Sequence, residues 1–307
     1  MTGDHMKRRI KVIASLAVAG LALVGCSSSD PTGQESKSAA PSGTIVIGSQ
    51  ASYSNEIIAE IYAQHLEAHG YTVDRQYQIG SREVYIPELE AGRVDIIPEY
   101  TGNLLQYYDS STTATTPEEI RTALDEALPE GLRILDLADA SDQDTYTVTR
   151  ETADEYGLTT IGDLAELSQP VALGANAEFE ERPYGPTGAK EVYGVDIAVT
   201  PINDYGGSLT LDALRNGDVQ VADIYSADPA IPANDLVILE DPEGLILTQN
   251  VVPLVTTKVD DDAAALLDEV SAHLDQETLV ALNTRSVNEQ ATSATIAKDW
   301  LAEVGLD

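Results

Sequence analysis

One short stretch occurs twice in the chain, and this repeat constrains the fold more than any other feature. Residues 92–103 and 217–228 each contain a glycine that ends a helix, a short apolar strand, and a tyrosine eight residues after the glycine. In the first copy we expect Pro98 to begin a loop that carries Tyr100. Open α/β sheets bind ligands at the carboxyl ends of their strands. We therefore expect Tyr100 and Tyr225 to face each other across a binding site.

The elements around each tyrosine follow the same order of strand, helix, strand, helix and strand. In the first half they are expected at 44–48, 54–70, 72–79, a short helix ending at 92, and 94–97. In the second half they are expected at 171–175, 187–193, 197–202, 209–215 and after 217. Gly48 precedes Tyr100 by 52 residues and Gly174 precedes Tyr225 by 51. The spacing predicts two similar α/β lobes.

The remaining elements connect the two lobes. Strands are expected at 132–137, 145–149, 236–239 and 251–256, and helices at 117–128, 260–274, 276–283 and 289–304. The C-terminal segment is too small for a third domain, so we expect it to pack on the first lobe. The chain then crosses between lobes twice, near Tyr146 and near Gln249. We expect lobe 1 to comprise 44–147 and 250–307, and lobe 2 to comprise 148–249.

The N-terminal segment has the pattern of an export signal. A basic stretch at 7–11 precedes an apolar stretch at 12–24, which is short for a membrane span. Leu23-Val-Gly-Cys26 matches the bacterial lipobox, so we expect a signal peptide over 1–25 and lipidation of Cys26. An uncleaved anchor with an incidental cysteine is the alternative. Residues 26–43 read as a flexible tether, and Met6 is the expected start.

Composition excludes several classes of function. The formal net charge is −35, and no Lys/Arg cluster lies outside the N-terminus, so nucleic acid is not an expected partner. Cys26 is the only cysteine, so the exported domain is expected to fold without disulfides. His65 and His69 lie four residues apart without a third ligand of suitable spacing, so we expect no metal site. We find no catalytic motif and expect neither an enzyme nor a cofactor.

Two α/β lobes, two crossings, a lipobox and a tether together indicate a substrate-binding lipoprotein of an ABC importer. The ligand is expected in the cleft between lobes that close by a hinge. Expected partners are a small solute, a permease with its ATPase, and the outer face of the cytoplasmic membrane, with the protein as a monomer. The alternatives are the same role with another polar ligand, such as an amino acid derivative, a sugar or an aromatic solute, and a surface sensor without a transporter.

Four motifs resemble those of a known family. They are Gly48-Ser-Gln50, Gly92-x-Val-Asp-Ile-Ile-Pro-Glu-Tyr-Thr-Gly102, Glu181-Arg-Pro183 and Asp223-x-Tyr225-Ser-x-Asp228. They resemble the osmoprotectant-binding proteins of ABC importers, which bind glycine betaine, choline or carnitine. The likeness covers about residues 44–300, in the same motif order. It implies a two-lobed, periplasmic-binding-protein-like (Venus flytrap) fold, in which a cage of tyrosines surrounds a quaternary ammonium.

The resemblance also implies residues for the site. The cage positions correspond to Tyr100, Tyr146 and Tyr225, although Tyr146 could instead be core. The fourth cage position corresponds to Gln249, where an amide replaces an aromatic face, so Gln249→Tyr is expected to tighten binding. Asp144 is expected near the cationic end.

The other end of the ligand needs hydrogen-bond donors. Gln50, Asn103 and Arg182 occupy positions that suit this role, and Arg182 is the candidate to bind a carboxylate. Alternatively, Gln50 only follows the strand-end Gly-Ser turn and does not contact the ligand, and Arg182 is solvated.

Overall fold

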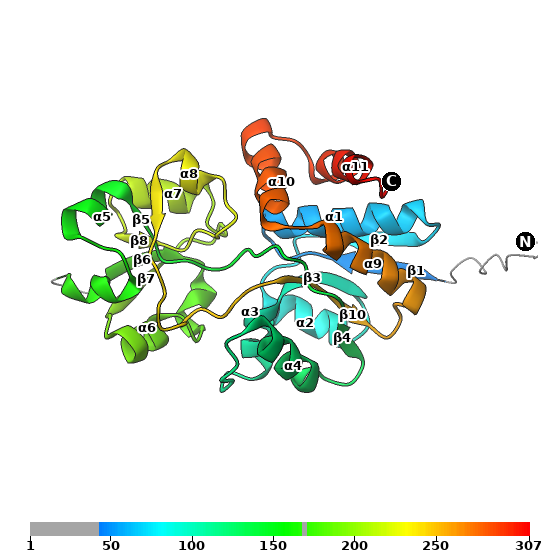
Figure 1. The fold of residues 1–307 in the computed structure, drawn as a ribbon, viewed down its shortest axis with the longest axis horizontal. Helices are drawn as coiled ribbons and strands as arrows, with labels where there is room; N and C mark the ends of the chain where they lie inside the picture. The colour runs from blue at the N-terminus through cyan, green and yellow to red at the C-terminus, as the bar shows by residue number, and fades with distance from the viewer. Residues whose placement is uncertain (1–42, 168–170) are drawn as a thin grey trace, which may run out of the picture. The chain divides into compact units, whose positions relative to one another are not determined.

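The computed structural model describes residues 43–167 and 171–307, and it contains two five-stranded sheets with helices on their faces (Figure 1). The predicted signal peptide, Cys26 and nearly all of the predicted tether lie outside the described residues. None of the helices in the described ranges is both long enough and apolar enough to cross a membrane.

The elements follow the expected order. The first half contains β1 (Thr44–Gly48), α1 (Tyr53–Ala68), β2 (Thr72–Gln76), α2 (Arg82–Glu90), β3 (Ile96–Tyr100), α3 (Thr101–Tyr108), α4 (Pro117–Ala127) and β4 (Leu132–Ile134). The second contains β5 (Thr147–Thr149), α5 (Arg150–Tyr156), η1 (Ile161–Glu166), β6 (Val171–Ala175), η2 (Ala177–Glu181), α6 (Pro186–Tyr193), β7 (Ile197–Pro201), α7 (Ser208–Arg215), β8 (Val221–Ala222), α8 (Ala230–Ala233) and β9 (Leu236–Ile238). The chain ends with β10 (Val251–Thr256), α9 (Asp261–His273), α10 (Gln276–Glu289) and α11 (Ser293–Val304).

The two sheets have the same topology. Their strand orders are β2-β1-β3-β10-β4 and β7-β6-β8-β5-β9, and in each the first three strands run parallel. The fourth strand of each sheet, β10 in the first and β5 in the second, is antiparallel to both neighbours and follows directly after a crossing from the other sheet. The chain therefore crosses between the sheets twice, once before β5 and once before β10. This confirms the two-lobed α/β fold; the boundary expected after residue 147 falls inside β5.

Side chains of the first sheet alternate between two cores. Ile96 and Val251 belong to the cluster under α1, α9, α10 and α11, whereas Ile97 and Val252 belong to the cluster under α2, α3 and α4. Successive residues of a strand point to opposite faces, so a sheet covered on both faces needs continuous apolar strands. Figure 1 shows these helices on opposite sides of the sheet. The second sheet divides in the same way, with Val221 and Ala222 in different clusters.

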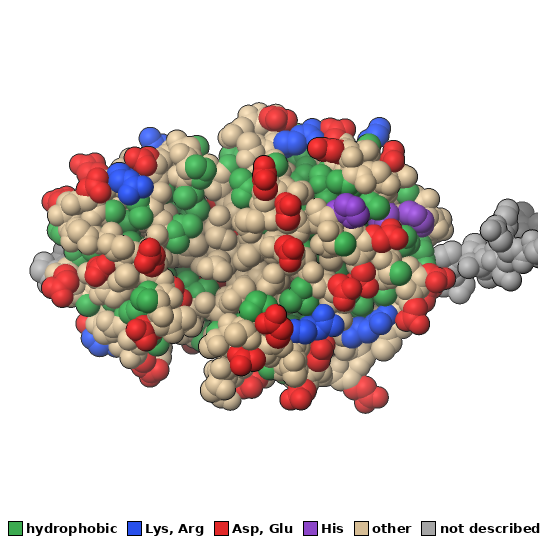
Figure 2. All heavy atoms as spheres, viewed as in Figure 1, with side chains coloured by type: hydrophobic (Ala, Val, Ile, Leu, Met, Phe, Trp, Pro, Cys, Tyr) green, Lys and Arg blue, Asp and Glu red, His purple; other side chains and the backbone are tan. Residues whose placement is uncertain are grey.

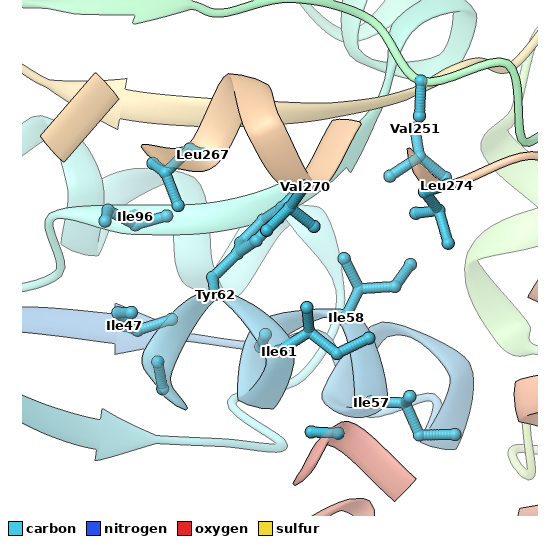
Figure 3. Packing of buried hydrophobic residues seen from close by; sticks show 14 of the residues in the cluster. Ile47, Ile57, Ile58, Ile61, Tyr62, Ile96, Val251, Leu267, Val270 and Leu274 are labelled. Carbon is cyan, nitrogen blue, oxygen red and sulfur yellow. The ribbon is translucent and has the colours of Figure 1, made fainter. Parts of the chain in front are cut away.

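The largest core is organised around α1. Tyr62 is fully buried, and Figure 3 shows it reaching from α1 toward Val270 of α9. Ile47 of β1 and Ile96 of β3 belong to the same cluster and lie to one side of Tyr62 in Figure 3. The last three helices thus pack on the first lobe, as the sequence predicted.

The stretch around Tyr100 differs from its prediction in one respect. Pro98 does not begin a loop, because β3 continues to Tyr100. Pro98 lies opposite Pro253 of β10, and since neither residue has an N–H group, their pairing needs no hydrogen bond between them. The free carbonyl of Pro98 accepts a hydrogen bond from Nδ2 of Asn55 at 2.8 Å. Tyr100 is therefore held by the sheet itself.

One helix contains a proline, and two helix predictions needed correction. The helix α2 continues through Pro87, whose ring nitrogen cannot donate to the carbonyl of Glu83. At the C-terminus α10 extends to Glu289, and α11 begins only at Ser293 after its N-cap Thr292. The Thr292 side chain accepts a hydrogen bond from the backbone of Thr295, which fixes that start.

Acidic side chains are scattered over the visible face of the molecule. Figure 2 shows Asp and Glu distributed over both halves, with few Lys and Arg between them. This distribution agrees with the net charge of −35. It offers no basic surface in this view.

Candidate ligand-binding site

A pocket lies between the two lobes and is lined by both of them. It contains about 600 Å³ of space between protein atoms, part of it open to solvent. Its lining, which we call the cleft pocket, comprises Gln50, Ser52, Ser81, Arg82, Tyr100, Asn103, Asp142, Asp144, Asn176, Glu178, Phe179, Arg182, Tyr184, Tyr205, Asp223 and Tyr225. The first six belong to the first lobe, and Asp142 and Asp144 lie on the first crossing.

Five aromatic side chains line the cleft pocket, four of them tyrosines. Tyr100 ends β3, whereas Tyr225 lies three residues beyond β8. Tyr184 packs edge-on against Phe179 with ring centroids 5.6 Å apart. Tyr205 has a φ of 55°, and its backbone N–H donates to Oδ1 of Asn176. The left-handed conformation is unusual for a tyrosine, and it places this ring at the pocket.

The phenols in the pocket stay neutral. Burial raises the pKa of Tyr225 well above its usual value, and the charges of Asp144 and Asp223 raise it further. Burial likewise raises the pKa of Tyr184, again with Asp144 as the next cause. A neutral phenol keeps an electron-rich face, and such faces attract cations.

Three buried carboxyl groups lie beside these rings. Burial raises the pKa of Asp142 to about 7, with Asp228 and Asp144 raising it further and a hydrogen bond from the backbone of Ala227 acting against them. Burial also raises the pKa of Asp223, and the charge of Asp144 is the next cause. A positive ligand in the pocket would relieve this crowding of negative charge.

Both arginines of the pocket are already paired with carboxylates. Nε and Nη2 of Arg82 donate to the two carboxylate oxygens of Glu99 at 2.8 and 2.9 Å, and both side chains are buried. The guanidinium of Arg182 donates to both carboxylate oxygens of Glu83 at 2.6 and 3.3 Å. Partial burial of Glu83 acts the other way, but the hydrogen bonds from Arg182 hold its pKa at about 2. Each guanidinium thus has its own counter-charge.

Asn103 connects both crossings of the chain. Its backbone N–H donates to Oε1 of Gln249 at 2.8 Å, and Nε2 of Gln249 donates to its Oδ1 at 2.7 Å. Its own Nδ2 donates to Oδ2 of Asp144 at 2.7 Å and to the Tyr184 hydroxyl at 3.1 Å. A Cβ at Gly102 would lie only 2.8 Å from Nε2 of Gln249, so glycine is needed for this approach. Asn103 therefore presents its amide to the pocket in one fixed orientation.

Comparison with known proteins identifies the family. Residues 43–303 match the family described as the substrate-binding domain of an ABC-type glycine betaine transport system. The chain belongs to this family. It is therefore a substrate-binding component of an ABC transporter, and its family functions in the transport of small osmolytes rather than in catalysis.

Relatives of this binding protein are found in other bacteria. It is 28% identical over 275 residues to a glycine-betaine-binding protein of Pseudomonas aeruginosa, covering 85% of this chain and 88% of the relative. It is 26% identical over 276 residues to the glycine betaine-binding protein YehZ of Escherichia coli, covering 85% and 90%. A crystal structure titled as a glycine betaine/carnitine/choline ABC transporter superposes with a TM-score of 0.68 at 21% identity, covering 86% of this chain and 98% of that one. This last likeness supports the fold alone.

The structure brings most of the predicted site residues of the binding protein together. Six of the eight line the cleft pocket: Tyr100, Tyr225, Asn103, Gln50, Arg182 and Asp144. The Gln50 amide donates to the Tyr85 hydroxyl, and Arg182 is occupied by Glu83. Both of these predicted ligand donors therefore already have protein partners.

The other two predicted residues lie behind the pocket wall. Tyr146 is fully buried in the core of the second lobe, where its hydroxyl donates to the carbonyl of Tyr184 at 2.7 Å. Gln249 is fully buried as well and contacts Asn103. Neither side chain lines the cleft pocket. Both residues hold pocket residues in place, because the crossing segments direct their side chains into the protein.

Sequence reasoning missed several lining residues. Among them are Tyr184, Tyr205, Phe179, Arg82, Asp142 and Asp223. Tyr184 stands one residue after the Glu181-Arg-Pro183 motif, and Asp223 begins another motif, so their neighbourhood carried a signal. Tyr205 is followed by two glycines, which indicate a turn. They do not indicate in which direction the tyrosine ring points.

The buried position of Gln249 reverses the effect first expected for its replacement by tyrosine. In Gln249→Tyr, the larger ring cannot make both hydrogen bonds to Asn103, and overpacking of a core typically costs about 1–3 kcal/mol. We expect a lower midpoint of thermal unfolding, measured by circular dichroism. Gln76→Tyr, at an exposed position of the edge strand β2, is the matched control and should leave the midpoint unchanged. An unchanged midpoint for Gln249→Tyr together with tighter ligand binding would contradict this view.

Proposed function

We propose that the protein captures a quaternary-ammonium solute, of the glycine betaine or choline type, in the cleft pocket. It then delivers the solute to a membrane permease that is driven by an ATPase. The observation that carries the proposal is the combination of tyrosine rings with buried carboxylates around one pocket.

The chemistry of the ligand explains this combination. A trimethylammonium group carries positive charge but cannot donate a hydrogen bond, so it is bound through aromatic faces and nearby negative charge. Each aromatic face contributes about 0.5–2 kcal/mol, depending on desolvation. Tyr100, Tyr184, Tyr205 and Tyr225 can supply such faces, and Asp144 can supply the charge. The names of the Pseudomonas aeruginosa and Escherichia coli relatives, which bind glycine betaine, support this ligand class.

The proposal includes attachment to the cell envelope. The basic and apolar segments before the lipobox support cleavage of residues 1–25 and lipidation of Cys26. Residues 26–43 would then tether the two lobes, 44–147 with 250–307 and 148–249, to the outer face of the cytoplasmic membrane. We propose that the protein works there as a monomer.

Titration calorimetry tests the ligand class. The exported chain from residue 26, carrying Cys26→Ser so that it cannot be lipidated, is titrated with glycine betaine and with choline. We expect saturable heat with at least one of them. Because the ligand binds only the folded state, a concentration of 100 times Kd should also stabilise the protein by about 2.7 kcal/mol in a thermal-shift assay.

The other outcomes separate the alternatives. If no quaternary ammonium gives heat at millimolar concentration, the proposed ligand class is wrong. Stabilisation by an amino acid derivative, a sugar or an aromatic solute would then identify the other ligand. Ligand binding without any effect on uptake, when the protein is removed from cells that have the permease, would favour a sensor.

A further inference from the structure

The charges of the cleft pocket do not balance. Four acidic residues line it, Asp142, Asp144, Glu178 and Asp223, against two arginines. Both arginines are paired with further carboxylates, those of Glu83 and Glu99. The pocket and its immediate partners therefore contain more negative than positive groups, even where Asp142 and Asp223 both hold a proton.

The ion pair of Arg182 with Glu83 joins the two lobes. Glu83 lies in α2 of the first lobe, and Arg182 follows η2 of the second. The Arg182 side chain is 16% exposed and lines the pocket, whereas Glu83 is 47% exposed and lies outside the lining. Glu83 is therefore accessible to substitution without being part of the pocket wall.

We propose that Glu83 determines the charge class of the ligand. By neutralising Arg182, it leaves the pocket acidic, so the pocket selects a quaternary cation such as choline over a zwitterion such as glycine betaine. This inference rests on the proposed function, because it concerns the choice between two members of the proposed ligand class.

A ligand carboxylate finds no free cation in the described part of the pocket. Arg82 is held by both oxygens of the buried Glu99, so recruiting it would strip a buried carboxylate of its partner. Arg182 would have to leave Glu83 in the same way. The amide groups of Gln50 and Asn103 already donate to protein acceptors. A carboxylate in the pocket would therefore face aspartates with no unpaired guanidinium to offset them.

A cationic alcohol such as choline matches the carboxyl groups of the pocket. Within residues 43–167 and 171–307, no salt bridge joins Asp142, Asp144 or Asp223 to a lysine or arginine. Asp144 accepts from Asn103, Asp223 from the backbone of Thr145, and Asp142 from the backbone of Ala227. A quaternary ammonium supplies the missing positive charge, and a hydroxyl group can donate to one of these carboxylates. The same groups that repel a zwitterion's carboxylate thus favour choline.

Competition between the two ligands tests the inference. The exported chain with Cys26→Ser is titrated calorimetrically with choline and with glycine betaine at pH 7.5. We expect choline to bind at least tenfold more tightly. If glycine betaine binds as tightly as choline or more tightly, the inference is overturned while the proposed function stands. If neither binds, the proposed function itself fails.

Substitution of Glu83 tests the residue assigned to the discrimination. Glu83→Gln frees Arg182 while preserving side-chain size at a half-exposed position, so we expect at least a fivefold gain in betaine affinity relative to choline. Glu88→Gln, in the same helix and paired with Arg93 outside the pocket, is the matched control and should leave the ratio unchanged. A ratio that is equal in both variants would overturn the role of Glu83.

A substitution of Asp144 tests the contribution of a pocket carboxylate to the choice of ligand. Asp144→Asn removes one carboxylate but keeps its size, and it should weaken choline about tenfold while leaving glycine betaine unchanged or tighter. Equal weakening of both ligands would show that Asp144 acts on the ammonium group that they share, and would contradict charge selection. The thermal midpoint of each apo variant, measured in parallel, identifies any variant that fails to fold.

Discussion

Replacing Tyr225 with leucine is expected to weaken binding of the quaternary ammonium ligand by about 5- to 30-fold. Tyr225 lines the cleft pocket beyond the end of β8 and lies near Asp144 and Asp223, which raise the pKa of its buried phenol. Leucine keeps an apolar side chain there but has no aromatic face. The loss of one desolvated cation–π contact costs about 1–2 kcal/mol, which corresponds to this change in Kd.

Calorimetric titration with choline measures the effect. Tyr156→Leu is the matched control, because Tyr156 is 55% exposed on α5 and lies outside the pocket lining. The control should bind choline with the affinity of the unaltered protein. Unchanged affinity in Tyr225→Leu would mean that this ring does not contact the ligand, and the aromatic cage would have to be placed on the other tyrosines.

Replacing Glu99 with glutamine should destabilise the protein by about 3–5 kcal/mol. Glu99 is fully buried, accepts two hydrogen bonds from Arg82, and accepts others from the Tyr85 hydroxyl and the backbone of Tyr100. Glutamine has one acceptor oxygen and no charge, so the buried guanidinium of Arg82 loses its counter-charge. Breaking a buried ion pair by removing one partner has an effect of this size.

Urea unfolding, followed by circular dichroism, measures this loss of stability. Glu88→Gln is again the control, since its ion pair with Arg93 is exposed to solvent and its loss should leave the stability nearly unchanged. A loss below about 1 kcal/mol for Glu99→Gln would show that Arg82 finds another partner or water in the pocket. Because Arg82 lines the pocket, that result would also weaken the argument that it is unavailable to a ligand.

The sequence determined the fold and part of the site. The apolar runs around Ile47 and Ile97 specified strands that are buried on both faces, and the repeated spacing from Gly48 to Tyr100 and from Gly174 to Tyr225 specified two similar lobes. These signals are local, because strand and helix periods act over a few residues. They placed Tyr100 and Tyr225 at strand ends, where the structure has them lining one pocket.

The direction of side chains on the crossings was decided by the tertiary structure. Asp142, Asp144 and Tyr146 occupy every second position along one crossing. The two aspartates nevertheless line the pocket, whereas Tyr146 enters the core of the second lobe. The change occurs because β5 joins the second sheet at Thr147, and the covered face of that sheet takes the tyrosine. Nothing in the local pattern distinguishes these environments.

Ion pairs and hydrogen bonds between residues far apart in the chain could not be predicted from the sequence either. Glu83 and Arg182 are 99 residues apart, and their ion pair exists because two separately folded lobes bring α2 and the end of η2 together. Gln249 reaches Asn103 across 146 residues in the same way. The sequence by itself determined which residues end strands and which residues cover the sheets, because the period of apolar residues indicates both. The partners of the charged and amide groups, and with them the charge of the pocket, were decided only when the two lobes met.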